Sequence, residues 1–210
     1  NTKGFGKVRG LNPDYLSASN RDDVQVPLSG QGGTLIGMPY PCCCEDARNG
    51  RTYWTNNSAA VAAVIAMPTT AHNVAIQNNE PDGGRSLIIH KVSAHSAVAG
   101  AVLYQACIIA AIGQTREAII AQSALTVKQA NGGGKNDTRV RVIAGGTALT
   151  TLVAGNWFCC SNSITQVTAN VGGWAQEAIF EGMIIVPPGR FFAVHVLASA
   201  VGLTPLCQIY

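Results

Sequence analysis

Apolar and polar residues alternate along much of this chain with a period of two, which is the repeat of a β-strand. The clearest case is Arg139-Val140-Arg141-Val142, where two arginines lie on the face opposite two valines. Other short apolar runs end at Gly, Pro, Asn or Asp, residues that commonly bound strands. The pattern predicts strands over residues 73–77, 86–94, 101–112, 119–128, 139–142, 147–153, 157–160, 164–168, 175–186, 191–198 and 207–210.

The turn between the last two long strands has the most specific sequence signal. Pro188 followed by Gly189 suits the two central positions of a type II turn, because Pro fixes a negative φ and Gly accepts a positive one. Asn49-Gly50 suits a tight type I′ hairpin for a related reason. Residues 59–67 fit a short helix that ends before Pro68, and they fit a strand equally well.

Short strands that are separated by turns and do not alternate with helices predict an all-β fold of the antiparallel jelly-roll β-sandwich type. We expect this domain to span residues 66–210. Residues 1–65 are predicted to form an extended N-terminal arm, because glycines and prolines are frequent there and few residues could fill a core. Within this arm, Val24 and Val26 alternate like a short strand.

Charged residues are scarce and unevenly distributed, which bears on function. None occurs from Val142 to Gln176 or from Phe191 to Tyr210, and they make up 12% of the chain, where about 25% is typical of soluble proteins. Polar residues and glycines interrupt both stretches, so neither predicts a membrane span. We expect a protein with so little charge to be covered by other protein, and the 142–176 stretch in particular to contact another subunit.

The net charge of +3 is too small to predict nucleic-acid binding as the main activity. Part of it comes from Lys3, Lys7 and Arg9, which could form a basic arm that contacts nucleic acid. A solvated terminus is the simpler interpretation of these three residues.

The seven cysteines do not have the spacing of a metal site. Cys42, Cys43 and Cys44 are consecutive, as are Cys159 and Cys160, whereas zinc ligands are usually separated by about two to four residues. Most of the cysteines are therefore expected to be small buried apolar residues. A disulfide between the 42–44 cluster and another segment is the alternative.

Candidate catalytic residues form no recognised motif. A metal site built by three histidines from neighbouring strands is one hypothesis, but the paired HxH or HxD/E pattern is missing; the histidines are His72, His90, His95 and His195. Glu177 and Glu181 would share a strand face, as a glycosidase carboxylate pair or as a solvated edge. We expect no catalytic, cofactor-binding or metal-binding residues, no cofactor and no enzymatic activity.

Two segments of the second half, residues 70–78 and 83–92, resemble small structural proteins of bacteriophage virions. In them a short strand and a polar turn lead into a glycine, a basic residue and a further strand. The hairpin at residues 186–192 is similar to the penultimate turn of jelly-roll trimers, in phages and in the C1q/tumour-necrosis-factor group. The resemblance covers about residues 69–210 of the chain.

This resemblance implies a capsid, capsid-decoration or fibre-type subunit of a virion, whose partners are copies of itself and other virion proteins. Aromatic residues bury the largest areas, so we expect core or interface anchors at Trp157, Trp174, Phe191 and Phe192. The alternative is an extracellular C1q/TNF-like or lectin-like trimeric binding module. A metal-dependent jelly-roll enzyme is the third hypothesis.

Overall fold

The computed structural model describes residues 50–57, 60–96, 104–132, 137–145, 148–161, 165–167, 174–199 and 202–210, together with residue 47 and strands 6–8 and 24–26. The chain divides into two compact units, Asn1–Cys44 and Glu45–Tyr210. In the first unit, β1 (Gly6–Val8) pairs with β2 (Val24–Val26) in an antiparallel sheet, and β2 is a strand as predicted. The boundary predicted after residue 65 lies inside the second unit.

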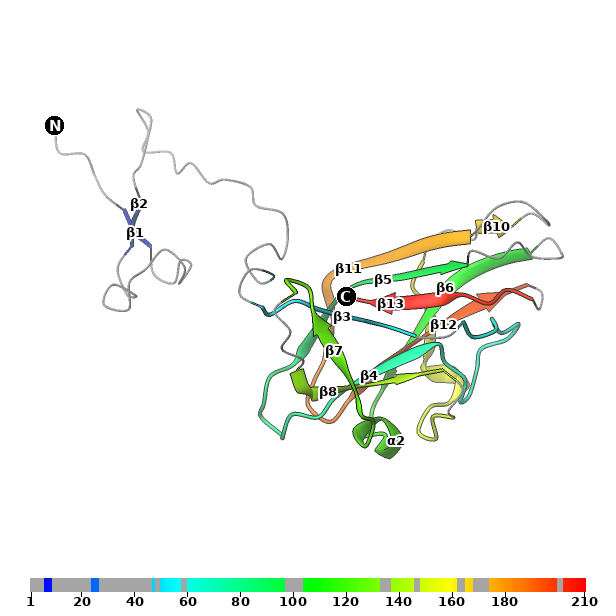
Figure 1. The fold of residues 1–210 in the computed structure, drawn as a ribbon, viewed down its shortest axis with the longest axis horizontal. Helices are drawn as coiled ribbons and strands as arrows, with labels where there is room; N and C mark the ends of the chain where they lie inside the picture. Colours follow the sequence, from blue (N-terminus) through cyan, green and yellow to red (C-terminus); the bar gives the residue numbers. More distant parts are fainter. Residues whose placement is uncertain are drawn as a thin grey trace, which may run out of the picture. The chain divides into compact units, whose positions relative to one another are not determined.

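The second unit is an all-β structure built on one eleven-stranded antiparallel sheet (Figure 1). Its strands are β3 (Tyr53–Asn56), β4 (Val74–Asn78), β5 (Leu87–Ser96), β6 (Tyr104–Gly113), β7 (Leu125–Gln129), β8 (Asp137–Ala144), β9 (Trp157–Cys159), β10 (Thr165–Val167), β11 (Trp174–Val186), β12 (Phe191–Ala198) and β13 (Leu206–Ile209). The hydrogen-bonded order is β10-β6-β12-β4-β8-β7-β3-β13-β5-β11, and β9 pairs with β6 beside this path. The sheet curls, so that β11 at one end approaches β6 and β10 near the other.

Strand β12 is buried on both faces because it lies between two apolar clusters. Phe192 and Val194 belong to the cluster that joins the two halves of the curled sheet. Phe191 and Ala193 belong to a second cluster on the opposite face. Successive side chains of a strand point to opposite faces, so one strand contributes to both clusters. This double burial explains why residues 191–198 carry no Asp, Glu, Lys or Arg.

The second cluster is covered by a segment of the same chain. Helix α2 (Ala118–Ala121) buries Ile120 in it, and residues 148–157 bury Leu149, Leu152 and Trp157. This part of the charge-free 142–176 stretch therefore packs on its own sheet. Packing explains the apolar character of Leu149, Leu152 and Trp157, whereas residues 148, 150, 151 and 153–155 are exposed. The contact of this stretch with another subunit stays a prediction.

Three predicted elements differ from the structure. Residues 118–121 form α2, and the strand predicted from residue 119 begins at Leu125. The strand predicted over 147–153 is wrong, because residues 148–153 form no regular strand. Both segments pack apolar side chains against a face of the sheet instead of pairing with its strands. Their composition therefore resembles that of a buried strand. Residues 60–67 form neither a helix nor a regular strand, although Val64 makes an isolated parallel bridge to Leu197.

The predicted type II turn between β11 and β12 is confirmed. The Arg190 N–H donates to the Pro187 carbonyl over 3.1 Å, and Gly189 has a φ of +71°. The turn joins β11 directly to β12, the strand that contributes side chains to both apolar clusters.

Candidate functional site

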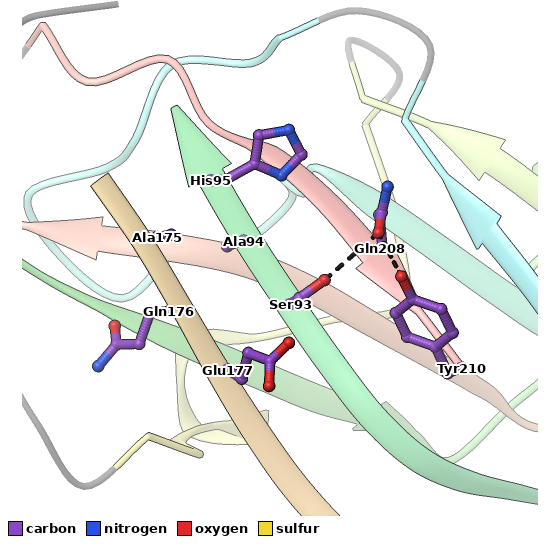
Figure 2. Close-up of a pocket in the computed structure, with 8 residues that line it drawn as sticks. All are labelled: Ser93, Ala94, His95, Ala175, Gln176, Glu177, Gln208 and Tyr210. Atoms are coloured by element: carbon purple, nitrogen blue, oxygen red, sulfur yellow. Dashed lines mark hydrogen bonds between the residues drawn. The ribbon is translucent and has the colours of Figure 1, made fainter. Parts of the chain in front are cut away.

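The outer face of β13, β5 and β11 carries a shallow groove of about 410 Å³ (Figure 2). Side chains on three adjacent strands line it, because residues two apart on a strand point to the same face. Ser93 and His95 come from β5, Glu177 from β11 and Gln208 from β13, with Tyr210 just beyond β13. Six of the groove's eight lining residues carry polar groups, and they offer hydroxyl, imidazole, carboxylate and amide groups.

Figure 2 shows Ser93, Gln208 and Tyr210 joined by two hydrogen bonds. The Tyr210 hydroxyl donates to Gln208 Oε1 over 2.5 Å, and the Ser93 hydroxyl donates to the same oxygen over 3.5 Å. Both bonds use the oxygen of the amide. The Gln208 amino group therefore remains available to a ligand, with no hydrogen-bond partner among the described residues.

Lys91 joins the groove to the rest of the face. Its Nζ lies 3.0 Å from Glu177 Oε1 and 4.8 Å from the centre of the Tyr210 ring. The ion pair is partly exposed, so it stabilises the fold by about 1 kcal/mol or less. Its main effect is to hold the Glu177 carboxylate and the Tyr210 ring in place.

An apolar strip continues the same outer face beyond the groove. It consists of Ile88 on β5 and Ile179, Met183 and Ile185 on β11, which are 63%, 58%, 78% and 52% exposed. Ile88 lies directly opposite Ile185 in the register of the two strands. Four large exposed apolar side chains thus lie on two adjacent strands of one face, and exposed apolar patches mark interaction surfaces.

A β-bulge interrupts β11 within the strip. The register shifts between Ile179 and Ile184, and Glu181 and Gly182 have φ values of +49° and +85°. Positive φ is costly for a non-glycine residue such as Glu181, whereas Gly182 accepts it. The bulge keeps Glu181 exposed among apolar neighbours.

Away from this face, two histidines are buried in the interior. His72 and His195 are 1% and 0% exposed, and burial lowers the pKa of each to about 4. The His195 Nδ1–H donates to Asn73 Oδ1. His195 Nε2 and both ring nitrogens of His72 have no hydrogen-bond partner in the described part of the chain.

Glu117 is a second buried ionisable residue, and its surroundings favour its charged form. Its carboxylate accepts hydrogen bonds from the backbone N–H and the hydroxyl of both Thr150 and Thr151, at 2.9–3.2 Å for the shortest contact of each donor. Burial alone would raise the pKa of Glu117, but these hydrogen bonds outweigh it and hold the pKa below its ordinary value. The carboxylate thus fastens residues 150–151 to the start of helix α2, which is a structural role.

The four predicted anchors lie inside the subunit. Trp157 and Phe191 belong to the cluster under residues 148–157, and Trp174 and Phe192 belong to the cluster between the sheet halves. Each is at least nine-tenths buried within one copy. Their contact with a second copy stays a prediction.

The other sequence candidates are dispersed. His90 and His95 lie on β5 and His195 on β12, and within the described ranges no three His, Cys, Asp or Glu side chains form a possible metal site. Glu177 is paired with Lys91, while Glu181 lies in the bulge.

The described cysteines are free thiols: Cys107, Cys159, Cys160 and Cys207. Cys42, Cys43, Cys44, Lys3 and Arg9 lie outside the described residues, and Lys7 is described as part of β1.

Sequence reasoning missed the apolar strip. Its signal is that residues 174–186 are apolar on both faces, with Ile179, Met183 and Ile185 on one and Ala178, Phe180 and Ile184 on the other. That pattern fits a strand buried on both faces. It does not reveal that β11 ends the sheet.

Of the helices in the described part of the chain, none has the length and apolar composition to cross a membrane. Neither a protein-family model nor a curated protein sequence matches this chain.

Proposed function

We propose that this chain is a structural subunit of a virion that assembles with copies of itself and has no catalytic activity. The observation that carries the proposal is the set of large apolar side chains that one copy leaves exposed. Eight such residues are exposed in the described part of the chain: Ile65, Ile88, Ile119, Leu125, Val153, Ile179, Met183 and Ile185. Apolar surface of this kind favours association, because burying it removes it from water.

A jelly roll is the finer description of the fold that we propose. In one half of the sheet β3, β13, β5 and β11 are neighbours, and in the other β4, β12, β6 and β9 are. Neighbouring strands thus come from distant parts of the chain, as two interlocked Greek keys require. In this interpretation β7 and β8 form an inserted hairpin beside β4.

The virion context rests on the resemblance of residues 70–78, 83–92 and 186–192 to phage structural proteins. The turn at 187–190, with Gly189 at positive φ, is consistent with that resemblance. A capsid, a decoration protein and a fibre are all assemblies of identical subunits, so the proposal covers these three forms.

Light scattering after size exclusion tests the proposal. We expect a mass that is a multiple of 21.8 kDa, and electron microscopy of the same fraction should show particles or fibres of regular dimensions. A stable monomer at high protein concentration would contradict it.

The groove favours a second candidate, a ligand-binding module of the lectin type. The free Gln208 amino group, the His95 imidazole and the Glu177 carboxylate could bind sugar hydroxyls beside the Tyr210 ring. An array of neutral glycans, probed with the wild-type protein and with Tyr210→Ala, separates the two candidates. Binding that Tyr210→Ala abolishes supports the module, and no binding to any glycan excludes it.

A further inference from the structure

We propose that the apolar strip of Ile88, Ile179, Met183 and Ile185 packs face to face against the same strip of a second copy of this chain. The inference rests on the proposed function, since it names the surface through which one copy recognises another. It also moves the predicted interface from the charge-free 142–176 stretch to the outer face of β5 and β11.

The size of the strip suits the centre of a protein–protein contact. Four large side chains, each more than half exposed, present on the order of 400 Å² of apolar surface. Each partner in a standard interface contributes roughly 800 Å². The strip therefore supplies about half of one side as an apolar centre, and the polar groups next to it can supply a rim.

Packing through the face is favoured over pairing through the edge of β11 that no described strand occupies. The bulge at Glu181 and Gly182 interrupts the strand and shifts its register. Bulges and charged side chains are the usual means by which an edge strand avoids pairing with another chain. The exposed Glu181 adds such a charge, so the side chains are the surface that β11 presents to a partner.

The charges beside the strip favour an identical partner. Lys91 and Glu177 lie at its border on β5 and β11, and they carry opposite charges. A two-fold related copy can set each charge near its opposite. With Glu181 the border has a net charge of −1, from one cation and two carboxylates, which offers little attraction to a strongly acidic or basic partner.

A matched pair of double variants tests the surface. Met183→Glu/Ile185→Lys places two charges on the strip, and Val153→Glu/Leu125→Lys makes the same changes at exposed apolar residues outside it. We expect the strip variant to weaken association at least tenfold in sedimentation equilibrium, and the control to associate like the wild type. Thermal unfolding should be similar in both, because all four sites are exposed.

The outcomes separate the inference from the proposed function. If the wild type associates and the strip variant associates equally well, the inference fails and the proposed function stands. Equal weakening by both variants also contradicts it, because the contact would then not be specific to the strip. A monomeric wild type contradicts the proposed function itself.

A cross-linking experiment covers the case in which the strip variant does not fold. A photoreactive benzophenone side chain replaces Met183 in an equal mixture of ¹⁴N-labelled and ¹⁵N-labelled copies. Mass spectrometry should identify links to residues 174–186 of a differently labelled copy. Links within one copy to residues 1–44 would show that the chain's own N-terminal unit covers the strip, and would overturn the inference.

Discussion

At the scale of single residues, the chain buries ionisable side chains in two different ways. Glu117 is charged and accepts hydrogen bonds from Thr150 and Thr151. His72 and His195 are neutral, because the cost of burying a charged ring outweighs the compensation that nearby groups supply, such as the Glu117 charge near His72. As the pH falls, the fold should therefore lose stability through the two histidines at a higher pH than through Glu117.

The first prediction concerns the pH dependence of stability. Each histidine has a pKa of about 4 in the folded chain and 6.5 in the unfolded chain, so the unfolded state binds protons first as the pH falls. Stability is complete above pH 6.5 and decreases towards pH 4, by about 1.4 kcal/mol per pH unit for each histidine. Urea unfolding at about pH 7 and about pH 5.5 should differ by roughly 2–3 kcal/mol.

The double variant His72→Gln/His195→Gln should lose most of this pH dependence. His95→Gln, on the partly exposed outer face, is the control and should keep the wild-type slope. Equal slopes in all three proteins would refute the assignment to the buried pair.

The second prediction is that Glu117→Gln destabilises the fold by about 2–4 kcal/mol. The new amino group cannot accept the bonds that the Thr150 and Thr151 donors make to the carboxylate. Glu177→Gln removes an exposed carboxylate that pairs with Lys91, and it should cost about 1 kcal/mol or less. Chemical denaturation of the two variants measures the difference, and equal losses would contradict the role assigned to Glu117.

At the scale of the elements, β6 and β12 depend on close packing at one pair of residues. Phe191 is fully buried and lies opposite Gly113 in the register of the two strands. A Cβ on Gly113 would lie 2.0 Å from Phe191 Cε1, inside the ring's van der Waals surface. Glycine at residue 113 thus makes room for the aromatic ring that begins β12.

The third prediction is that Gly113→Ala costs about 3 kcal/mol, because the fully buried Phe191 ring must shift to admit the added methyl group. Gly155→Ala, where no atom lies within 4 Å of the added Cβ, should change stability by less than about 0.5 kcal/mol. Thermal melts of both variants decide the matter. A Gly113→Ala protein that melts like the wild type would mean that β6 and β12 are more loosely packed than described.

The sequence predicts elements well where one local rule decides them. The turn at Pro188-Gly189 requires a positive φ that glycine accepts, and β8 follows the alternation of Arg139 to Val142. Prediction failed at residues 147–153, since apolar residues that cover a sheet have the same composition as residues within one. The candidate surface was missed for a different reason: Ile179 and Phe180 are both apolar, and which of them is exposed depends on which face of β11 points into the apolar cluster of the curled sheet.

At the scale of the whole molecule, low charge and self-association are linked less directly than the sequence suggests. The subunit itself buries nearly all of residues 191–198 and, within residues 148–157, the side chains of Leu149, Leu152 and Trp157. The surface proposed for association consists of Ile88 on β5 and three residues of β11, a strand that contains two glutamates. The remaining argument for assembly is exposed apolar area.

The fourth prediction follows from that area. An association driven by apolar burial should persist when NaCl is raised from about 0.1 M to about 1 M, which shortens the screening length to roughly 3 Å. Ammonium sulfate should strengthen it, because excluded salts favour burial. Sedimentation in the two salts measures this. Dissociation by NaCl would instead indicate an interface dominated by Lys91, Glu177 and their counterparts.

The position of β13 has a consequence for how the protein is made. This strand, formed by residues 206–209, lies between β3 and β5 in the interior of the sheet. β3 is translated about 150 residues before its partner, so until β13 leaves the ribosome both neighbours have an unpaired edge. β13 is therefore the last strand of this sheet to be synthesised, and the nascent chain must avoid pairing with other nascent chains until this strand emerges.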